Sequence, residues 1–157
     1  MRPTHSYRTV WLSDVHLGSR ACRVRLLLDF LRSMECSTLY LVGDIIDLES
    51  LRSSYYWPDS HTEVLQLILE RSRNGTRVIY IPGNHDDPLR HLCGAVLGNI
   101  EIRPSAIHTT RTGRRLLVLH GDVFDGLIKC GRMATIVGSF AYRTLIRLNR
   151  AVHWIRV

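Results

Sequence analysis

Short runs of apolar residues, bounded by polar ones, recur along this chain and predict strands. Five segments show this pattern: Thr9–Ser13, Leu39–Val42, Arg77–Ile81, Asn99–Arg103 and Leu116–Leu119. The first three are typical of strands buried on both faces of a sheet. Pro82-Gly83 ends the third run, and the turn signal Thr112-Gly113 precedes the last.

Two stretches between these strands have the periodicity of helices. Apolar residues recur every three or four positions from Val24, which predicts a helix that ends before Ser37. A second helix is predicted to begin at Ser60, because Ser60 and Glu63 match a capping box, and to end at the Asn-Gly pair 74–75. This alternation of strands and helices is typical of a layered α/β domain.

Polar residues gather where the predicted strands end. Four clusters follow one another along the chain: Asp14-x-His16, Gly43-Asp44-x-x-Asp47, Gly83-Asn84-His85-Asp86 and His120-Gly121-Asp122. Ligands of α/β sheets bind at the carboxyl ends of the strands. We therefore expect these clusters to form one site.

The clusters combine hard oxygen donors with imidazoles. The oxygen donors are Asp14, Asp44 and Asn84, and the imidazoles are His16, His85 and His120. This mixture suits Mn²⁺, Fe²⁺ or Zn²⁺ better than Ca²⁺, and the lack of a nearby thiolate argues against a structural zinc site. Asp44 can bridge two ions, and ions about 3.5–4 Å apart would activate a bridging water for attack on a phosphoryl group. We expect two divalent ions, with Mn²⁺ as the metal.

The order of these motifs resembles that of the calcineurin-like metallophosphoesterase superfamily. The resemblance implies β-sheets flanked by helices and a metal-dependent phosphoester or pyrophosphate hydrolase. It implies that Asp14 and His16 bind one ion, that Asp44 bridges, and that Asn84 and His120 bind the other.

The resemblance also assigns roles to the neighbours of these ligands. It implies that His85 protonates the leaving oxygen or stabilises transition-state charge, oriented by Asp86. We expect Asp47 and Asp122 to orient ligands, and Trp11 to lie in the core. The histidines that carry no motif are predicted to be surface or packing residues: His5, His61, His91 and His108.

The H-G-D form at His120 and the apolar, basic segment after it resemble the UDP-2,3-diacylglucosamine diphosphatase branch. That branch cleaves the pyrophosphate of a UDP-linked diacyl sugar in lipid A synthesis, on the cytoplasmic face of the inner membrane. The resemblance therefore implies a phosphorylated, lipid-linked nucleotide as substrate. His85 departs from it, because that branch has Arg there. The alternatives are another phosphoester specificity or a degenerate, non-catalytic membrane-binding module.

The last motif of the superfamily, G-H-x-H, has no counterpart in this sequence, in which His153 is the only histidine after Asp122. That motif supplies one ligand to each metal. We expect the chain to be a C-terminally incomplete fragment. The alternatives are that water or a partner fills both positions, or that the chain is a degenerate relative.

The positive charge is concentrated in residues 126–157. The net charge is +7, and six of the 21 Lys and Arg residues lie in this segment, which has no acidic residue. Five of these six cations would share one side of a helix, which predicts a basic amphipathic lid or a contact with an anionic membrane surface. We therefore predict a core domain over 1–125 and a lid over 126–157.

The remaining composition bears on partners and compartment. The four cysteines are far apart and suggest a reducing environment. The first apolar run is too short for a signal peptide. We expect a cytoplasmic protein, peripheral on the inner face of the cell membrane. No nucleic-acid-binding motif is evident, so nucleic acid is not an expected partner. The sequence does not predict an oligomeric state.

Overall fold

The computed structural model describes residues 5–125. The chain divides into two compact units, residues 1–120 and 121–157, and each is described by itself. Within the second unit, the described part contains the short 3₁₀ helix η2 (Gly121–Phe124). The predicted lid over 126–157 lies outside the described residues.

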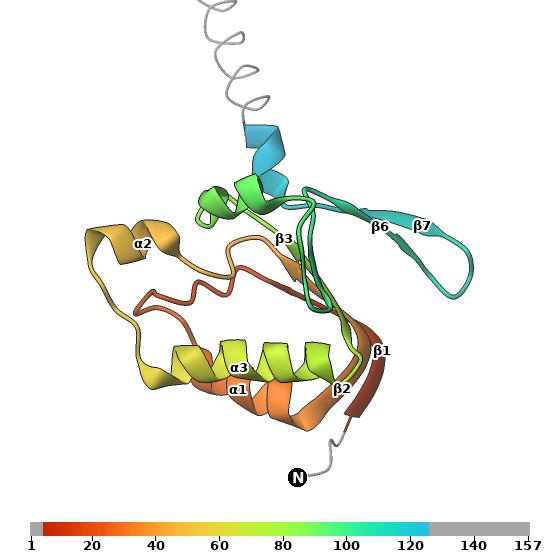
Figure 1. Cartoon of the computed structure of the whole chain (residues 1–157), viewed down its shortest axis with the longest axis horizontal. Helices are drawn as coiled ribbons and strands as arrows, with labels where there is room; N and C mark the ends of the chain where they lie inside the picture. The colour runs from red at the N-terminus through yellow and green to blue at the C-terminus, as the bar shows by residue number, and fades with distance from the viewer. Residues whose placement is uncertain (1–4, 126–157) are drawn as a thin grey trace, which may run out of the picture. The chain divides into compact units, whose positions relative to one another are not determined.

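The first unit alternates strands and helices around a parallel sheet (Figure 1). Its elements are β1 (His5–Ser13), α1 (Val24–Ser33), β2 (Met34–Val42), α2 (Leu48–Ser53), α3 (Asp59–Arg73), β3 (Arg77–Ile81), η1 (Asp87–Leu92), β4 (Val96–Leu97), β5 (Ile100–Ile102), β6 (Ala106–Thr109) and β7 (Arg115–Val118). The sheet order is β1-β2-β3-β5-β4, and only β4 runs antiparallel to its neighbour. Strands β6 and β7 form a separate antiparallel hairpin. The expected α/β fold class is confirmed.

One face of the sheet packs against α1 and α3, which lie side by side in Figure 1. Alternate strand residues point to this face, so Leu39 of β2 and Val78 of β3 meet Leu31 of α1 and Val64 of α3. All four side chains are fully buried. The main core therefore lies between the sheet and these two helices.

The other face of the sheet is covered in part by the β6–β7 hairpin. Ala106 of β6 packs there against Tyr40, Ile79 and Ile81 of β2 and β3. Trp11 of β1 is 46% exposed and stacks on Tyr40, with ring centroids 5.7 Å apart.

Two predictions about β1 are therefore wrong. Trp11 is not a core residue, and the strand is not buried on both faces, because β1 lies at the edge of the sheet. Only Val10 is buried within it.

The ends of α3 differ in how well the sequence predicted them. The helix begins at Asp59 after Pro58, and no side chain caps its first turn. The predicted capping box is wrong, because Ser60 lies inside the helix and Glu63 forms an ion pair with Arg32 of α1. At the other end, the Asn-Gly stop is confirmed. Gly75 has a φ of +98°, and its N–H donates to the carbonyl of Ser72.

The periodicity of apolar residues does not predict helix α2, because this helix has only six residues and none of them is buried. It begins after Asp47, whose carboxylate accepts a hydrogen bond from the Ser50 N–H at 2.8 Å. Within residues 5–125, no helix has the length and apolar character needed to cross a bilayer.

The packing of α1 yields a stability prediction. Leu31 is fully buried, so Leu31→Ala should lower the free energy of unfolding by about 2–5 kcal/mol through lost burial and a cavity. Leu26 of the same helix is 62% exposed, and Leu26→Ala should change the free energy of unfolding by less than about 0.5 kcal/mol. Urea unfolding followed by circular dichroism measures both. Equal losses in the two variants would contradict the described packing of α1.

Candidate metal centre

The segments that follow β1 and β2 turn sharply and run side by side. Asp14, His16 and Asp44 have φ values of +54°, +55° and +56°, a left-handed conformation that is uncommon outside glycine. The Asp14 N–H donates to the carbonyl of Gly43 at 3.1 Å, and the His16 N–H donates to that of Asp44 at 2.8 Å. These turns carry the first two predicted motifs to the same place.

Leu17 continues this pairing beyond the ends of the strands. Its N–H donates to the carbonyl of Ile45 at 2.9 Å, and its carbonyl accepts from the Asp47 N–H at 2.7 Å. The Leu17 side chain is fully buried in the main core. The backbone of the D-x-H segment is therefore fixed to the backbone of the segment that contains Asp44 and Asp47.

Asp44 is the central carboxylate of the site. It is 4% exposed, and its Oδ1 accepts a hydrogen bond from the His85 N–H at 2.9 Å. Its Oδ2 lies 3.9 Å from His16 Nε2 and 3.8 Å from His120 Nε2. These distances are too long for hydrogen bonds, but two ligands of one ion, each bound at about 2.0–2.2 Å, are separated by such distances.

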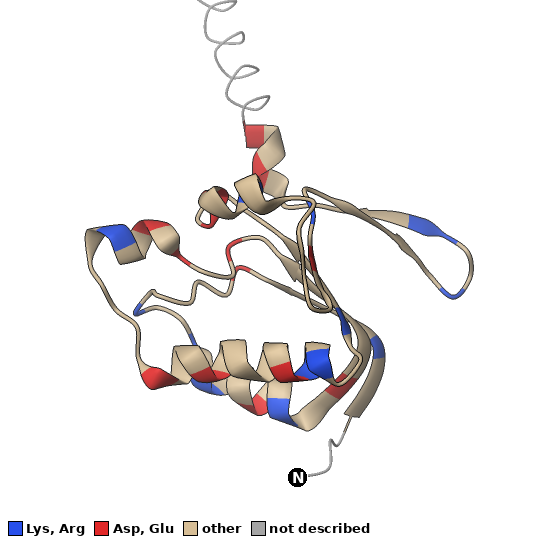
Figure 2. Ribbon diagram, viewed as in Figure 1, with Lys and Arg blue, Asp and Glu red and all other residues tan. Residues whose placement is uncertain are grey.

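Within residues 5–125, two groups of side chains have donor atoms close enough to hold an ion. Asp14, Asp44 and His120 form one group, and in each group the ligand atoms lie within 4.8 Å of one another. The second group contains His16, Asp47 and His85. Figure 2 shows acidic residues on the loops after β1 and β2 and at the start of α2. Carboxylate oxygens mixed with imidazole nitrogens fit divalent transition metals.

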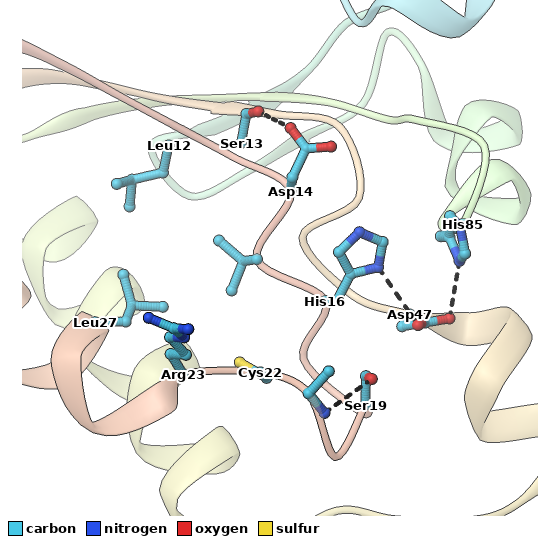
Figure 3. A pocket seen from close by; sticks show the side chains of 12 residues that line it. Leu12, Ser13, Asp14, His16, Ser19, Cys22, Arg23, Leu27, Asp47 and His85 are labelled. Atoms are coloured by element: carbon cyan, nitrogen blue, oxygen red, sulfur yellow. Dashed lines mark hydrogen bonds and ion pairs between the residues drawn. The ribbon is translucent and has the colours of Figure 1, made fainter.

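Asp47 holds two of the imidazoles (Figure 3). Its Oδ1 lies 3.0 Å from His85 Nδ1, and its Oδ2 lies 3.4 Å from His16 Nδ1. Burial alone would raise the pKa of Asp47, but hydrogen bonds from the Ser50 N–H and hydroxyl, together with His85, lower this pKa to about 2. The hydrogen bond with Asp47 in turn raises the pKa of His85. Asp47 is thus a charged anchor for both rings.

Asp86 has a different position from the one we expected. In the structure, the side chain that orients His85 is Asp47. Asp86 is instead fully buried and accepts hydrogen bonds from the backbone and from Tyr80. Its backbone donors are the N–H groups of Ile45, at 3.0 Å, and Gly83. Asp86 therefore fixes the loop after β3 to the loop after β2, and a direct catalytic role for it stays a prediction.

The other predicted residues differ in how closely they approach this centre. His120 lies 4.0 Å from Asp14 through its Nε2. Asn84 is exposed and lines a polar cavity together with His85. Asp122 belongs to the second unit. The assignment of individual ligands to each ion, including Asn84, stays a prediction.

His61, which was predicted to be a surface or packing residue, is a buried packing residue that supports the site. It is 1% exposed, and its Nδ1 accepts a hydrogen bond from the Gly18 N–H at 3.0 Å, two residues after His16. Burial lowers the pKa of His61, which favours the neutral ring that this bond requires. A Cβ on Gly18 would lie 2.7 Å from Leu51, so the loop passes closely between α2 and α3. No local motif signals this contact, because the partners are 43 residues apart.

Gly43 provides a test of the centre with a matched control. A Cβ at Gly43 would overlap the His120 ring, whereas one at Gly98 would meet nothing within 4 Å. The two glycines have φ values of +67° and +63°, so an alanine at either position bears a similar backbone strain of roughly 1–2 kcal/mol.

We therefore expect Gly43→Ala to weaken Mn²⁺ binding at least about tenfold by displacing His120, an effect of the size seen when ligand support is lost. Gly98→Ala should leave the affinity unchanged within about twofold, since its site is remote from the ligands. Calorimetric titration of both variants with Mn²⁺ measures this. Equal affinities would exclude His120 from the metal centre.

A protein family and a solved structure are similar to this chain. The model of the calcineurin-like phosphoesterase family matches residues 7–132, which include all four motifs. No curated protein matches the chain. A solved structure, the crystal structure of Pseudomonas putida nuclease MPE, is 24% identical with a TM-score of 0.38, and the alignment covers 60% of this chain and 46% of that one. The chain thus spans less than half of that nuclease. On the extent of the family match, the chain belongs to the calcineurin-like phosphoesterase family.

Proposed function

We propose that this chain is a phosphohydrolase that uses two divalent metal ions. Its family supports metal-dependent hydrolysis of phosphoesters in general. The observation that carries the proposal is the position of the buried Asp44 Oδ2, between His16 Nε2 and His120 Nε2. A buried carboxylate in this position is placed to be shared by two cations.

The chain supplies donors for both ions. The donor group around Asp44 favours a different division from the one that the family resemblance implies. Asp14 and His120 would hold one ion with Asp44, and His16, which the resemblance puts with Asp14, would hold the other next to the same carboxylate. When bound, the two ions would neutralise the negative charge of a phosphoryl group and make a nucleophile available at neutral pH. The side chains around them must position the substrate and handle the proton of the leaving group.

His85 is the side chain best placed for that proton. Its Nδ1 faces Asp47, which fixes the ring and leaves Nε2 available to a substrate. Its backbone N–H is bound by Asp44, so the loop that carries the ring is tied to the metal ligands. We propose that His85 donates a proton to the leaving oxygen or stabilises its charge.

Metal removal and two substitutions test this function. Chelation should abolish hydrolysis of a phosphoester and Mn²⁺ should restore it. His85→Ala should lower kcat by about 10²–10⁴-fold through loss of the proton donor, and Asn84→Ala should lower it through weaker metal or substrate binding. His91 is exposed and carries no motif, so His91→Ala is the control. Failure of the metal-loaded chain to hydrolyse any phosphoester or pyrophosphate would contradict the proposal.

We further propose that the substrate is the pyrophosphate of a UDP-linked diacyl sugar. The H-G-D sequence at His120 and the basic, apolar segment 126–157 support this assignment. We propose that this segment contacts an anionic membrane surface, where such a lipid would lie. The alternatives are a different phosphoester specificity and a non-catalytic membrane-binding module.

One assay separates these alternatives. With UDP-2,3-diacylglucosamine in lipid vesicles, the metal-loaded chain should release UMP, and faster when phosphatidylglycerol replaces phosphatidylcholine, because anionic lipid attracts basic segments. Hydrolysis of simple phosphodiesters without UMP release would favour another specificity. The non-catalytic module would be favoured if the unsubstituted chain shows no turnover and the Asp44→Ala variant still binds vesicles.

A further inference from the structure

Two cavities open beside the metal ligands, and the first has mostly apolar walls. It measures about 620 Å³ and contains Leu12, Val15, Cys22 and Leu27 along its walls (Figure 3). His16, Asp47 and His85 line one side, and Arg23 lies on the other side in Figure 3. This volume is typical of sites for small organic molecules, which span roughly 300–1,000 Å³. The cavity therefore extends from the metal ligands toward an apolar surface that ends in a cation.

Most side chains that line the second cavity are polar. It measures about 480 Å³ and is lined by residues of α2, of the loop after β3 and of the start of η1, where Asp87 adds a second carboxylate to that of Glu49. Glu49, Arg52 and Ser53 come from α2, and Asn84 and His85 come from the loop. Hydroxyl and amide groups donate and accept hydrogen bonds, and a guanidinium donates them, so this cavity suits a polar group such as a sugar.

His85 is the one side chain that lines both cavities. In the proposed function, His85 is the side chain that donates a proton to the leaving group. A phosphoryl group bound by ions at Asp14 and His16, which line the first cavity, would lie close to His85 and therefore beside the second cavity as well. A substituent on either side of the phosphorus then has a cavity of its own.

We infer that the substrate carries an organic group on each side of the scissile phosphoryl group, one apolar and one polar. This inference rests on the proposed phosphohydrolase function and restricts its substrates to phosphodiesters and substituted pyrophosphates, a class that includes the UDP-linked diacyl sugar. A phosphomonoester has one substituent, so it would leave one cavity without contacts. The difference in bound surface should therefore favour the diester.

Each cavity contains one arginine, Arg23 in the first and Arg52 in the second. Neither guanidinium pairs with an acidic side chain within residues 5–125, and both are exposed. Arg23 can contact the π-face of an aromatic group or bind an anion at the end of the apolar cavity. Arg52 lines the second cavity together with Glu49 and Asp87, whose carboxylates offer acceptors to hydrogen-bond donors such as the hydroxyl groups of a sugar.

The p-nitrophenyl ester of thymidine 5′-monophosphate is a suitable probe, because it is a phosphodiester with one aryl and one sugar substituent. Hydrolysis breaks the bond between phosphorus and the aryl oxygen, adds water, and releases p-nitrophenol and thymidine monophosphate. p-Nitrophenyl phosphate is the matched monoester. For the chain loaded with Mn²⁺, kcat/KM should be at least about tenfold higher for the diester.

Filling either cavity should remove this preference. Arg23→Trp and Ser53→Trp each place a large ring into one cavity and should raise KM for the diester at least about tenfold, since uniform binding is lost. The controls are Arg25→Trp and Ser54→Trp, at exposed positions that line neither cavity. All four positions lie at exposed sites, and circular dichroism verifies the fold.

The outcomes distinguish this inference from the proposed function. The inference would be overturned if kcat/KM for the monoester equals or exceeds that for the diester. It would also be overturned if neither Arg23→Trp nor Ser53→Trp changes KM for the diester. Either result leaves the proposed function standing. If neither ester is hydrolysed, the proposed function is judged by its own test with other phosphoesters and with pyrophosphates. Binding of diphenyl phosphate and of phenyl phosphate, measured by calorimetry, then decides the inference. It survives only if diphenyl phosphate binds more tightly.

Discussion

The site depends on the backbone pairing of residues 14–17 with residues 43–47. Hydrogen bonds from the D-x-H segment to the carbonyls of Gly43, Asp44 and Ile45 continue the register of β1 and β2 past the ends of these strands. Three left-handed residues set the direction in which the donors leave the backbone. Such conformations cost roughly 1–3 kcal/mol each and are found where function requires them. The parallel sheet thus brings together ligands that are distant in sequence.

The buried carboxylate of Asp44 makes this arrangement suitable for a cation. Asp86 and Asp47 are buried carboxylates whose oxygens accept hydrogen bonds from the backbone and from side chains. Asp44 is as deeply buried, but its Oδ2 faces two imidazole nitrogens beyond hydrogen-bond distance. A buried charge is stable only when it is paired or coordinates a metal. Two ions shared by Asp44 would satisfy this requirement, and the same two ions would serve catalysis.

The sequence predicted what local patterns encode. The strands at Arg77–Ile81 and Leu39–Val42, the stop of α3 at Gly75, and the four motifs at strand ends follow from apolar runs and turn chemistry. Partners that come from elsewhere in the fold could not be predicted. The exposure of Trp11 depends on the edge position of β1, and the contact of His61 with Gly18 depends on how α3 packs. For the same reason the partner of His85 is Asp47, from the segment before α2, and not its neighbour Asp86.

The central claim is that Asp44 is shared by two metal ions. Electron paramagnetic resonance of the chain loaded with two equivalents of Mn²⁺ tests it directly, because ions about 3.5–4 Å apart are coupled through a bridging ligand. The account predicts an exchange-coupled dinuclear signal that is lost in Asp44→Ala. A spectrum of isolated Mn²⁺ ions in the unsubstituted chain would contradict it.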